Sequence, residues 1–430
     1  MPMLPFETRQ EIIGLIKREV VPAMGCTEPA AVSLCTAKAV EILGNKPEKI
    51  RVLLSPNVLK NAMGVGIPGT NMIGLPIAIA LGAIVGKTSY QLEVLRDVTP
   101  ASVEQGRQMI DEGRITVDVK NGNCDTLHIE VQASAEDKVA TAIISGAHTN
   151  FVYVALNDNI IIDNRKPVTS FAAKDVIDLS LRKVWEFAIE SPIEELQFIL
   201  EARRLNKAAA DESLRGEWGH GLGSVVKNSA NSRRILGDTI LSHMIYYTSA
   251  ACDARMGGAK MPVMSNSGSG NQGIVSTLPV VVFAEDTSAS EEQLIRALIL
   301  SHLTVIYIKQ SLGRLSALCG CVVASTGSSC GITYLMGGGY EEVSMAVKNI
   351  IATLTGMICD GAKPSCALKL SSSVSTAAMA AKMAMEHRCV TSYEGIIDND
   401  VDKSIFNLTK IGSLGMAETD RMILNIMTQK

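Results

Sequence analysis

Ten cysteines are the residues of this 430-residue chain whose chemistry is most distinctive. Cys359 and Cys366 lie close together in the turn-rich stretch GMICDGAKPSC, Cys319 lies upstream in RLSALCGC, and Cys26 lies in MGCTEP. Thiolates bind soft metals and iron–sulfur clusters, and a cluster needs three or four of them. No C-x₂-C pair occurs, which disfavours a zinc ribbon or finger. A buried thiol without a role is the alternative for each cysteine.

A second group of residues could bind a small anion. Residues 252–273, CDARMGGAKMPVMSNSGSGNQG, are dense in Gly, Ser and Asn, whose backbone and side-chain N–H groups can surround a carboxylate. Arg255 could supply the opposite charge. The candidate substrate ligands of the loop are Ser265, Asn266, Ser267, Ser269 and Asn271. A flexible surface linker is the alternative, but the Met and Ala residues on its flanks favour burial.

Two further stretches offer a general base. His148 in SGAHTN ends a strand-like run. A lone histidine is more often structural, but this position beside Thr149 and Asn150 strengthens the case for an acid/base role. Thr149 and Asn150 are candidate substrate ligands. Lys60 and Asn61 lie at the edge of a Gly-rich turn in SPNVLKNAMGVGIPGT, which is not a dinucleotide-binding pattern. We therefore expect His148 or Lys60 to be the base, with Asn61 nearby.

Composition excludes several classes of protein. The chain is 47% hydrophobic, enough for one or two cores, and its net charge of -4 without a Lys/Arg run argues against a nucleic-acid partner. Its N-terminus lacks the pattern of a signal peptide, so we expect a cytoplasmic protein with reduced cysteines. Residues 315–340 are uncharged over a length that could cross ~30 Å of hydrocarbon. Their polar centre, ASTGSSCG, instead predicts a buried helical hairpin and no membrane partner.

The remaining patterns predict the elements that must position these residues. Short alternating runs within residues 48–165 predict an antiparallel sheet with one solvated face, interrupted by a helix near 101–113. A helix is expected to begin at Thr27. Helical spacing dominates from about residue 172 to the end. The sequence thus predicts an α+β protein, with an α+β domain at 1–170 and a mostly helical domain at 171–430; its Ala/Gly-rich helices permit a homodimer.

Taken together, several motifs resemble the bacterial and archaeal L-cysteine desulfidase family, a relative of the iron–sulfur L-serine dehydratases and their α-chain domain. In order along nearly the whole chain they are GCTEP, LKNAMGVGIPGT, GAHTN, CDARMGG, MSNSGSGNQG, RLSALC and GMICDGAKPSC. The resemblance implies a pyridoxal-independent [4Fe–4S] lyase that converts L-cysteine to pyruvate, ammonia and sulfide. It implies that Cys319 and Cys359 bind the cluster, with either Cys366 or Cys26 as the third ligand.

Cys321 and Cys330 lie outside the matching motif positions and are expected to pack in the core. Three alternatives remain at this point. The first is an L-serine dehydratase with the same cluster, because sequence does not separate a thiol from a hydroxyl leaving group. The second is a pyridoxal-dependent β-eliminase that uses Lys60 or Lys227 with the SGSGN loop. The third is a non-catalytic amino-acid-binding protein with a structural metal.

Overall fold

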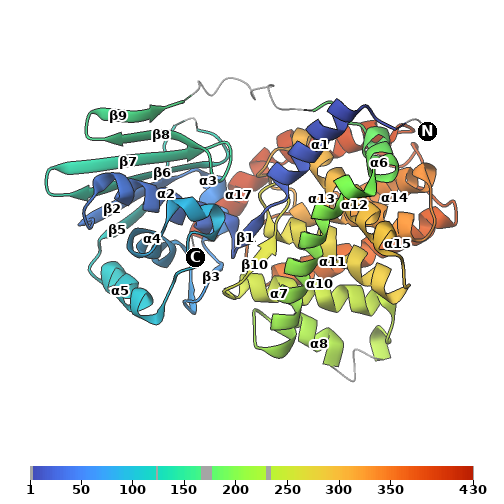
Figure 1. Cartoon of the computed structure of the whole chain (residues 1–430), viewed down its shortest axis with the longest axis horizontal. Helices are drawn as coiled ribbons and strands as arrows, with labels where there is room; N and C mark the ends of the chain where they lie inside the picture. Colours follow the sequence, from blue (N-terminus) through green and yellow to red (C-terminus); the bar gives the residue numbers. More distant parts are fainter. Residues whose placement is uncertain (1–2, 123, 166–176, 229–233, 430) are drawn as a thin grey trace.

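The computed structural model describes residues 3–122, 124–165, 177–228 and 234–429, which form an α/β lobe beside a larger helical lobe (Figure 1). A six-stranded sheet of order β5-β2-β6-β7-β8-β9 builds the first lobe. Its strands are β2 (Lys49–Leu54), β5 (Ile115–Val119), β6 (His128–Ala135), β7 (Lys138–Ser145), β8 (Phe151–Leu156) and β9 (Asn159–Asp163). The α+β class predicted from the sequence is confirmed.

Alternation along the strands decides which face of this sheet is covered. In β6, Ile129 and Val131 are fully buried, because they point toward helix α2 (Thr27–Leu43), whereas Gln132 lies on the opposite face. Helices α4 (Leu75–Ile84) and α5 (Pro100–Asp111) extend the same helical layer (Figure 1). The predicted helix start at Thr27 and the helix near 101–113 are both found. The α2 helix therefore runs from the GCTEP turn across the sheet.

The sheet differs from the prediction in one strand pair. Strands β2 and β5 run parallel, with Ile50 opposite Ile115, whereas the other neighbours are antiparallel. The segment between β2 and β5 contains α3 (Pro56–Ala62), α4 and α5, and a crossover of that length returns the chain to the same end of the sheet. The sheet is therefore mixed. An alternating pattern indicates a strand and its two faces, but it does not indicate the direction of the neighbouring strand.

The helical lobe surrounds a buried central helix, α13 (Gly320–Leu335), which packs against α11, α12, α14 and α15. The other helices of this lobe are α6 (Leu181–Glu190), α7 (Leu200–Arg215), α8 (Leu222–Asn228), α10 (Ile240–Met256), α11 (Gly270–Asp286), α12 (Glu291–Leu312), α14 (Tyr340–Leu354), α15 (Cys366–Met385) and α16 (Val401–Lys410). Short elements complete the chain: β3 (Gly66–Ile67), β4 (Met72–Ile73), 3₁₀ turns at Thr88–Glu93, Ile193–Glu195 and Gln197–Ile199, and a π turn at Ile411–Gly415.

The helical hairpin predicted for 315–340 is wrong, because this stretch forms one helix, α13, preceded by a short bridge. Its small residues serve close helix packing rather than a chain reversal. A Cβ on Gly327 would lie 2.4 Å from the carbonyl oxygen of Ser301 on α12. Within the described ranges, no helix is both long enough and apolar enough to cross a bilayer.

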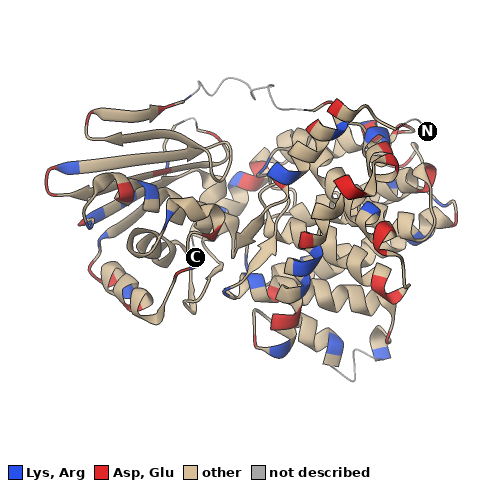
Figure 2. Cartoon of the chain, in the orientation of Figure 1, with Lys and Arg blue, Asp and Glu red and all other residues tan. Residues whose placement is uncertain are grey.

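Both ends of the chain cross between the lobes. Helix α1 (Phe6–Glu19) contacts α12, and strand β1 (Pro22–Met24) pairs with β10 (Pro262–Met264) of the helical lobe. At the other end, α17 (Ala417–Thr428) returns to pack on α3 of the α/β lobe (Figure 1). The domain boundary predicted near residue 170 lies outside the described residues. Acidic and basic residues are interspersed over both lobes in the view of Figure 2.

Candidate active site at the junction of the lobes

Two of the candidate cluster cysteines lie on one short antiparallel bridge. Leu318 pairs with Ile358, and the backbone N–H of Cys319 donates to the carbonyl of Met357 at 2.9 Å. The bridge joins the turn before α13 to the turn after α14. Cys319 and Cys359, which are distant in sequence, therefore lie at the same edge of the helical lobe.

Two of the candidate cluster cysteines lie at the N-termini of helices. Cys319 is the N-cap of α13 and Cys366 is the first residue of α15, so both thiols lie at helix ends that favour a thiolate. Burial raises the pKa of Cys359 to about 11 and also raises that of Cys366, and the charge of the neighbouring Cys319 adds to both shifts. A hydrogen bond from Cys321 lowers the pKa of Cys319. The thiols of Cys319, Cys359 and Cys366 are thus within electrostatic reach of one another.

The thiol set of Cys319, Cys359 and Cys366 has the donor chemistry of an iron–sulfur cluster. Over the described part of the chain, no three His, Cys, Asp or Glu side chains gather closely enough to hold one ion. In an iron–sulfur cluster each cysteine thiolate binds a different iron, so three thiolates would serve one cluster rather than one ion. Cys330 lies apart from this set, with its thiol on the carbonyl of Thr326 within α13.

The GCTEP turn of the α/β lobe contributes a buried carboxylate, Glu28. Its Oε2 accepts a hydrogen bond from the Cys26 thiol at 3.0 Å, its Oε1 accepts one from Asn61 Nδ2 at 3.2 Å, and Oε1 lies 3.8 Å from His148 Nε2. Burial alone would raise the pKa of Glu28, but His148, Cys26 and Arg255 together hold it at about 2. Glu28 is therefore ionised inside the protein. Burial and the charge of Glu28 both raise the pKa of Cys26.

His148 lies against the Ser/Asn/Gly loop of the other lobe. A Cβ on Gly268 would be 2.6 Å from His148 Cε1, so the loop backbone touches the imidazole. Ser267 and Gly268 have φ of +48° and +80°, a conformation that costs energy for Ser and is typical of functional loops. His148 is 4% exposed, and its Nε2 has no hydrogen bond to any described residue.

Arg255 joins the same loop to the GCTEP turn. Its Nε donates to the carbonyl of Gly25 at 3.0 Å, and its Nη1 donates to Asn271 Oδ1 at 3.0 Å. A Cβ on Gly270 would lie 2.2 Å from Arg255 Nε, which requires glycine there. Arg255, Asn271, His148 and Glu28 therefore converge from both lobes on one buried region.

Other predicted ligands serve as supports. Ser265 donates to the carbonyl of Val21, Ser269 caps α11, and Ser267 donates to Asn266 Oδ1. Asn266 Nδ2 in turn bonds His302. The hydrogen bonds of these side chains hold the loop in its conformation, so these polar groups are already bonded to the protein.

Thr149 and Asn150 are exposed, and Asn150 bonds the carbonyl of Ser145. The structure therefore does not bring these two residues to the junction. Lys60 lies beside the cysteine bridge, where its ammonium donates to the carbonyl of Cys359 at 3.2 Å and pairs with Asp420. Lys227, the other candidate for a Schiff base, is exposed on α8.

Sequence reasoning missed three residues of the site. Glu28 lies within the GCTEP motif but is not among the candidate residues named from the sequence. Gln272 is 2% exposed and donates to the carbonyl of Asn266, while its Oε1 lacks a partner within the described ranges. Lys309 is buried on α12, which lowers its pKa to about 8, and the charges of Arg314, Cys359 and Glu28 act on it. In the sequence this lysine is one residue of a long helical pattern, and nothing beside it on α12 indicates that it is buried.

Three buried polar atoms at this junction have no hydrogen-bond partner in the described structure: Asn61 Oδ1, His148 Nε2 and Gln272 Oε1. Buried polar groups are nearly always paired, so unpaired ones mark places where a ligand or water completes the bonding. The donor of each amide is already used, by Glu28 for Asn61 and by Asn266 for Gln272. Both amide oxygens are therefore oriented acceptors, as an ammonium group requires.

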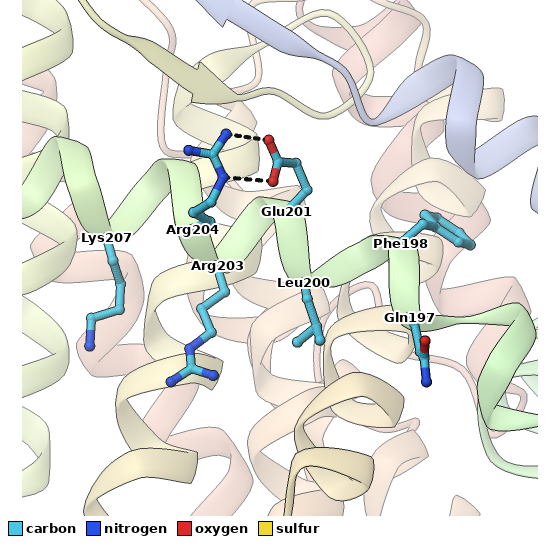
Figure 3. Close-up of a pocket in the computed structure, with 7 residues that line it drawn as sticks. All are labelled: Gln197, Phe198, Leu200, Glu201, Arg203, Arg204 and Lys207. Atoms are coloured by element: carbon cyan, nitrogen blue, oxygen red, sulfur yellow. Dashed lines mark hydrogen bonds and ion pairs between the residues drawn. The ribbon is translucent and has the colours of Figure 1, made fainter.

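A separate hollow of about 580 Å³ lies on the outer side of α7 (Figure 3). Its charged groups are already paired, because Arg204 bonds Glu201 while Arg203 and Lys207 bond Glu285. Figure 3 shows the Arg203 and Lys207 side chains extending to one side of the helix and the Glu201–Arg204 pair to the other. This hollow has none of the cysteines and is not the candidate site.

Comparison with known proteins places the chain in a family. The serine dehydratase alpha chain family matches residues 89–425, which include the loop at 265–273 and the cysteines from Cys319 to Cys366. A UPF0597 protein of Bacteroides fragilis is 64% identical over 98% of both chains, and one of Phocaeicola vulgatus is 63% identical over 100% of this chain and 99% of the relative. One of Oleidesulfovibrio alaskensis is 44% identical over 97% of each. The chain belongs to the serine dehydratase alpha chain family.

Proposed function

We propose that the protein is a pyridoxal-independent iron–sulfur lyase that converts L-cysteine to pyruvate, ammonia and sulfide. The observation that carries the proposal is the meeting of two groups of residues at the lobe junction. One is the thiol set, with Cys319 and Cys366 at helix N-termini and Cys359 on the bridge between Leu318 and Ile358. The other is the buried set of Glu28, His148 and Arg255, whose neighbours carry unpaired acceptors. Membership of a dehydratase family supports elimination as the reaction type.

Cys319, Cys359 and Cys366 would hold the [4Fe–4S] cluster. Cys366 is favoured over Cys26 as the third ligand, because the Cys366 thiol donates to the carbonyl of Gly361 in the loop that carries Cys359, whereas the Cys26 thiol donates to Glu28. A cluster held by these three thiolates would supply a Lewis acid for the sulfur that leaves the substrate.

The residues of the chain bind the amino acid and move its proton. Arg255, oriented by Gly25 and Asn271, binds the carboxylate. The unpaired oxygens of Asn61 and Gln272 and the ionised Glu28 receive the ammonium group. His148 removes the Cα proton through its unpaired Nε2. The Cα–H and Cβ–S bonds break, sulfide leaves, and the aminoacrylate product hydrolyses to pyruvate and ammonia.

Lys60 is less suited to the role of base. Its ammonium is paired with Asp420 and bonded to the carbonyl of Cys359. The same pairing opposes a pyridoxal Schiff base on Lys60, and Lys227 is on the surface. His148 is therefore the base in this proposal.

Cysteine is proposed as the preferred substrate because a thiolate is a better leaving group than hydroxide and a softer ligand for iron. L-serine is the second candidate, and the family description of serine dehydratase favours it.

The test is anaerobic turnover of L-cysteine and L-serine at equal concentration by reconstituted protein, with pyruvate as the product measured. Faster turnover of cysteine is expected. Faster turnover of serine would make the protein a serine dehydratase, and no pyruvate from either substrate with the cluster intact would reject the lyase. Borohydride treatment is the control for pyridoxal, since it reduces a Schiff base and thereby alters the yellow absorbance band of that cofactor.

A further inference from the structure

The last helix of the chain lies on the α/β lobe next to the cysteine bridge. Helix α17 packs against α3, and its Asp420 accepts hydrogen bonds from two side chains of α3, Asn57 and Lys60. Lys60 is 1% exposed, so its ammonium is almost completely removed from water. A buried ammonium needs a paired charge and hydrogen-bond acceptors, and Asp420 supplies the charge.

The second acceptor of Lys60 is the backbone of the cluster loop. Its Nζ donates to the carbonyl oxygen of Cys359 at 3.2 Å. Two residues later, Gly361 has φ of +89°, and a Cβ there would lie 2.4 Å from the Lys60 carbonyl. Met427 of α17 approaches the same glycine. The loop that carries Cys359 is thus held between α3 and α17 by a charged hydrogen bond and a close backbone contact.

We propose that Lys60 is a positioning residue for the cluster loop, and that α17 completes this role by pairing Asp420 with it. The Lys60–Asp420 pair holds the carbonyl of Cys359 and thereby the bridge between Leu318 and Ile358, on which Cys319 and Cys359 stand. The inference rests on the proposed function only in that the positioned thiols are cluster ligands. It gives helix α17 a role in a site whose thiols come from the N-termini of α13 and α15 and from the turn between α14 and α15.

The test follows the bridge itself in metal-free, substrate-free protein, so it is independent of the cluster and of the reaction. The backbone N–H of Cys359 donates to the carbonyl of Ala317 at 2.7 Å, and its hydrogen–deuterium exchange reports opening of the bridge. Lys60→Met removes a charged hydrogen bond and is expected to speed exchange at Cys359 by ~10-fold or more. Asp420→Ala leaves Lys60 without its carboxylate and is expected to act in the same direction.

Two further variants separate positioning from other roles. Lys120→Met breaks another lysine–carboxylate pair, with Glu130 in the sheet, and is expected to leave exchange at Cys359 unchanged. Lys60→Arg keeps the donor and the charge but cannot act as a base, since the arginine side chain does not deprotonate in proteins. Lys60→Arg is expected to restore slow exchange at Cys359. In the reconstituted enzyme it is expected to be more active than Lys60→Met.

Unchanged exchange at Cys359 in folded Lys60→Met, with its melting temperature within the range of Lys120→Met, would overturn the proposal. If Lys60→Met does not fold, the same result in Asp420→Ala overturns it. Equal loss of activity in Lys60→Arg and Lys60→Met with normal exchange would assign Lys60 to the chemistry instead. The exchange experiment tests the positioning role of Lys60 even if the protein is not a lyase, because it uses neither cluster nor substrate.

Discussion

Replacing Gly268 by alanine would test whether His148 and the Ser/Asn/Gly loop act together. The added Cβ would lie 2.6 Å from His148 Cε1, and ordinary contacts begin near 3.4 Å, so the imidazole or the loop must move by about 0.8 Å. A displacement of about 1 Å at a reacting group can cost ~10²-fold in rate. Alanine at φ of +80° should also destabilise the protein by ~1–2 kcal/mol.

The control shares the backbone strain without the contact. Gly337 has φ of +89° and nothing within 4 Å of the position of its Cβ, so Gly337→Ala should lose similar stability but keep its activity. The assay measures kcat/KM for pyruvate formation, iron content and the free energy of unfolding for both variants. We expect the ~10²-fold loss in Gly268→Ala alone, with its iron content retained. Equal activities of the two variants would refute the placement of His148 against this loop as a requirement for turnover.

Three further predictions concern single side chains. Cys359→Ala should abolish iron binding after anaerobic reconstitution, whereas Cys389→Ala should retain iron; full iron and sulfide in Cys359→Ala would reject the ligand assignment. His148→Ala should lower turnover by ~10²–10⁴-fold at unchanged iron content, and near-normal turnover would exclude it as the base. Burial raises the pKa of Glu28, but hydrogen bonds and charges hold it at about 2, below the usual 4.5, so its ionised form stabilises the folded state by about 3 kcal/mol above pH 5. That contribution is lost as pH falls through 2. The difference in free energy of unfolding between the wild type and Glu28→Gln, measured by urea unfolding, should therefore shrink on acidification. A difference that is independent of pH would contradict the ionised carboxylate.

Periodicity predicted the elements well where a single local cause sets them. The alternating runs of β6 and β7 and the start of α2 at Thr27 follow from local preferences and face alternation. The direction of β5 does not, because a parallel or antiparallel neighbour reads the same along one strand. The uncharged stretch around α13 predicts a hairpin wrongly, because a helix that is buried on all sides lacks the apolar periodicity by which its length is recognised.

The candidate site shows a similar division. Cys319, Cys359 and Arg255 could be proposed from the sequence because their residue types or motifs are chemically distinctive. Glu28 and Lys309 were missed, since an acidic residue in a first helical turn and a lysine in a long helix are ordinary in sequence. Only the structure reveals that both are buried and that Glu28 is beside His148. The contact between Asp420 and Lys60 joins residues from opposite ends of the chain and has no local signal.

The measurement that tests the central claim most directly is the iron and acid-labile sulfide content of the anaerobically reconstituted protein, taken together with its rate of pyruvate formation. The proposed site predicts about four iron and four sulfide per chain, and activity that rises in proportion to them. Pyruvate formed at full rate by protein without iron would contradict the claim.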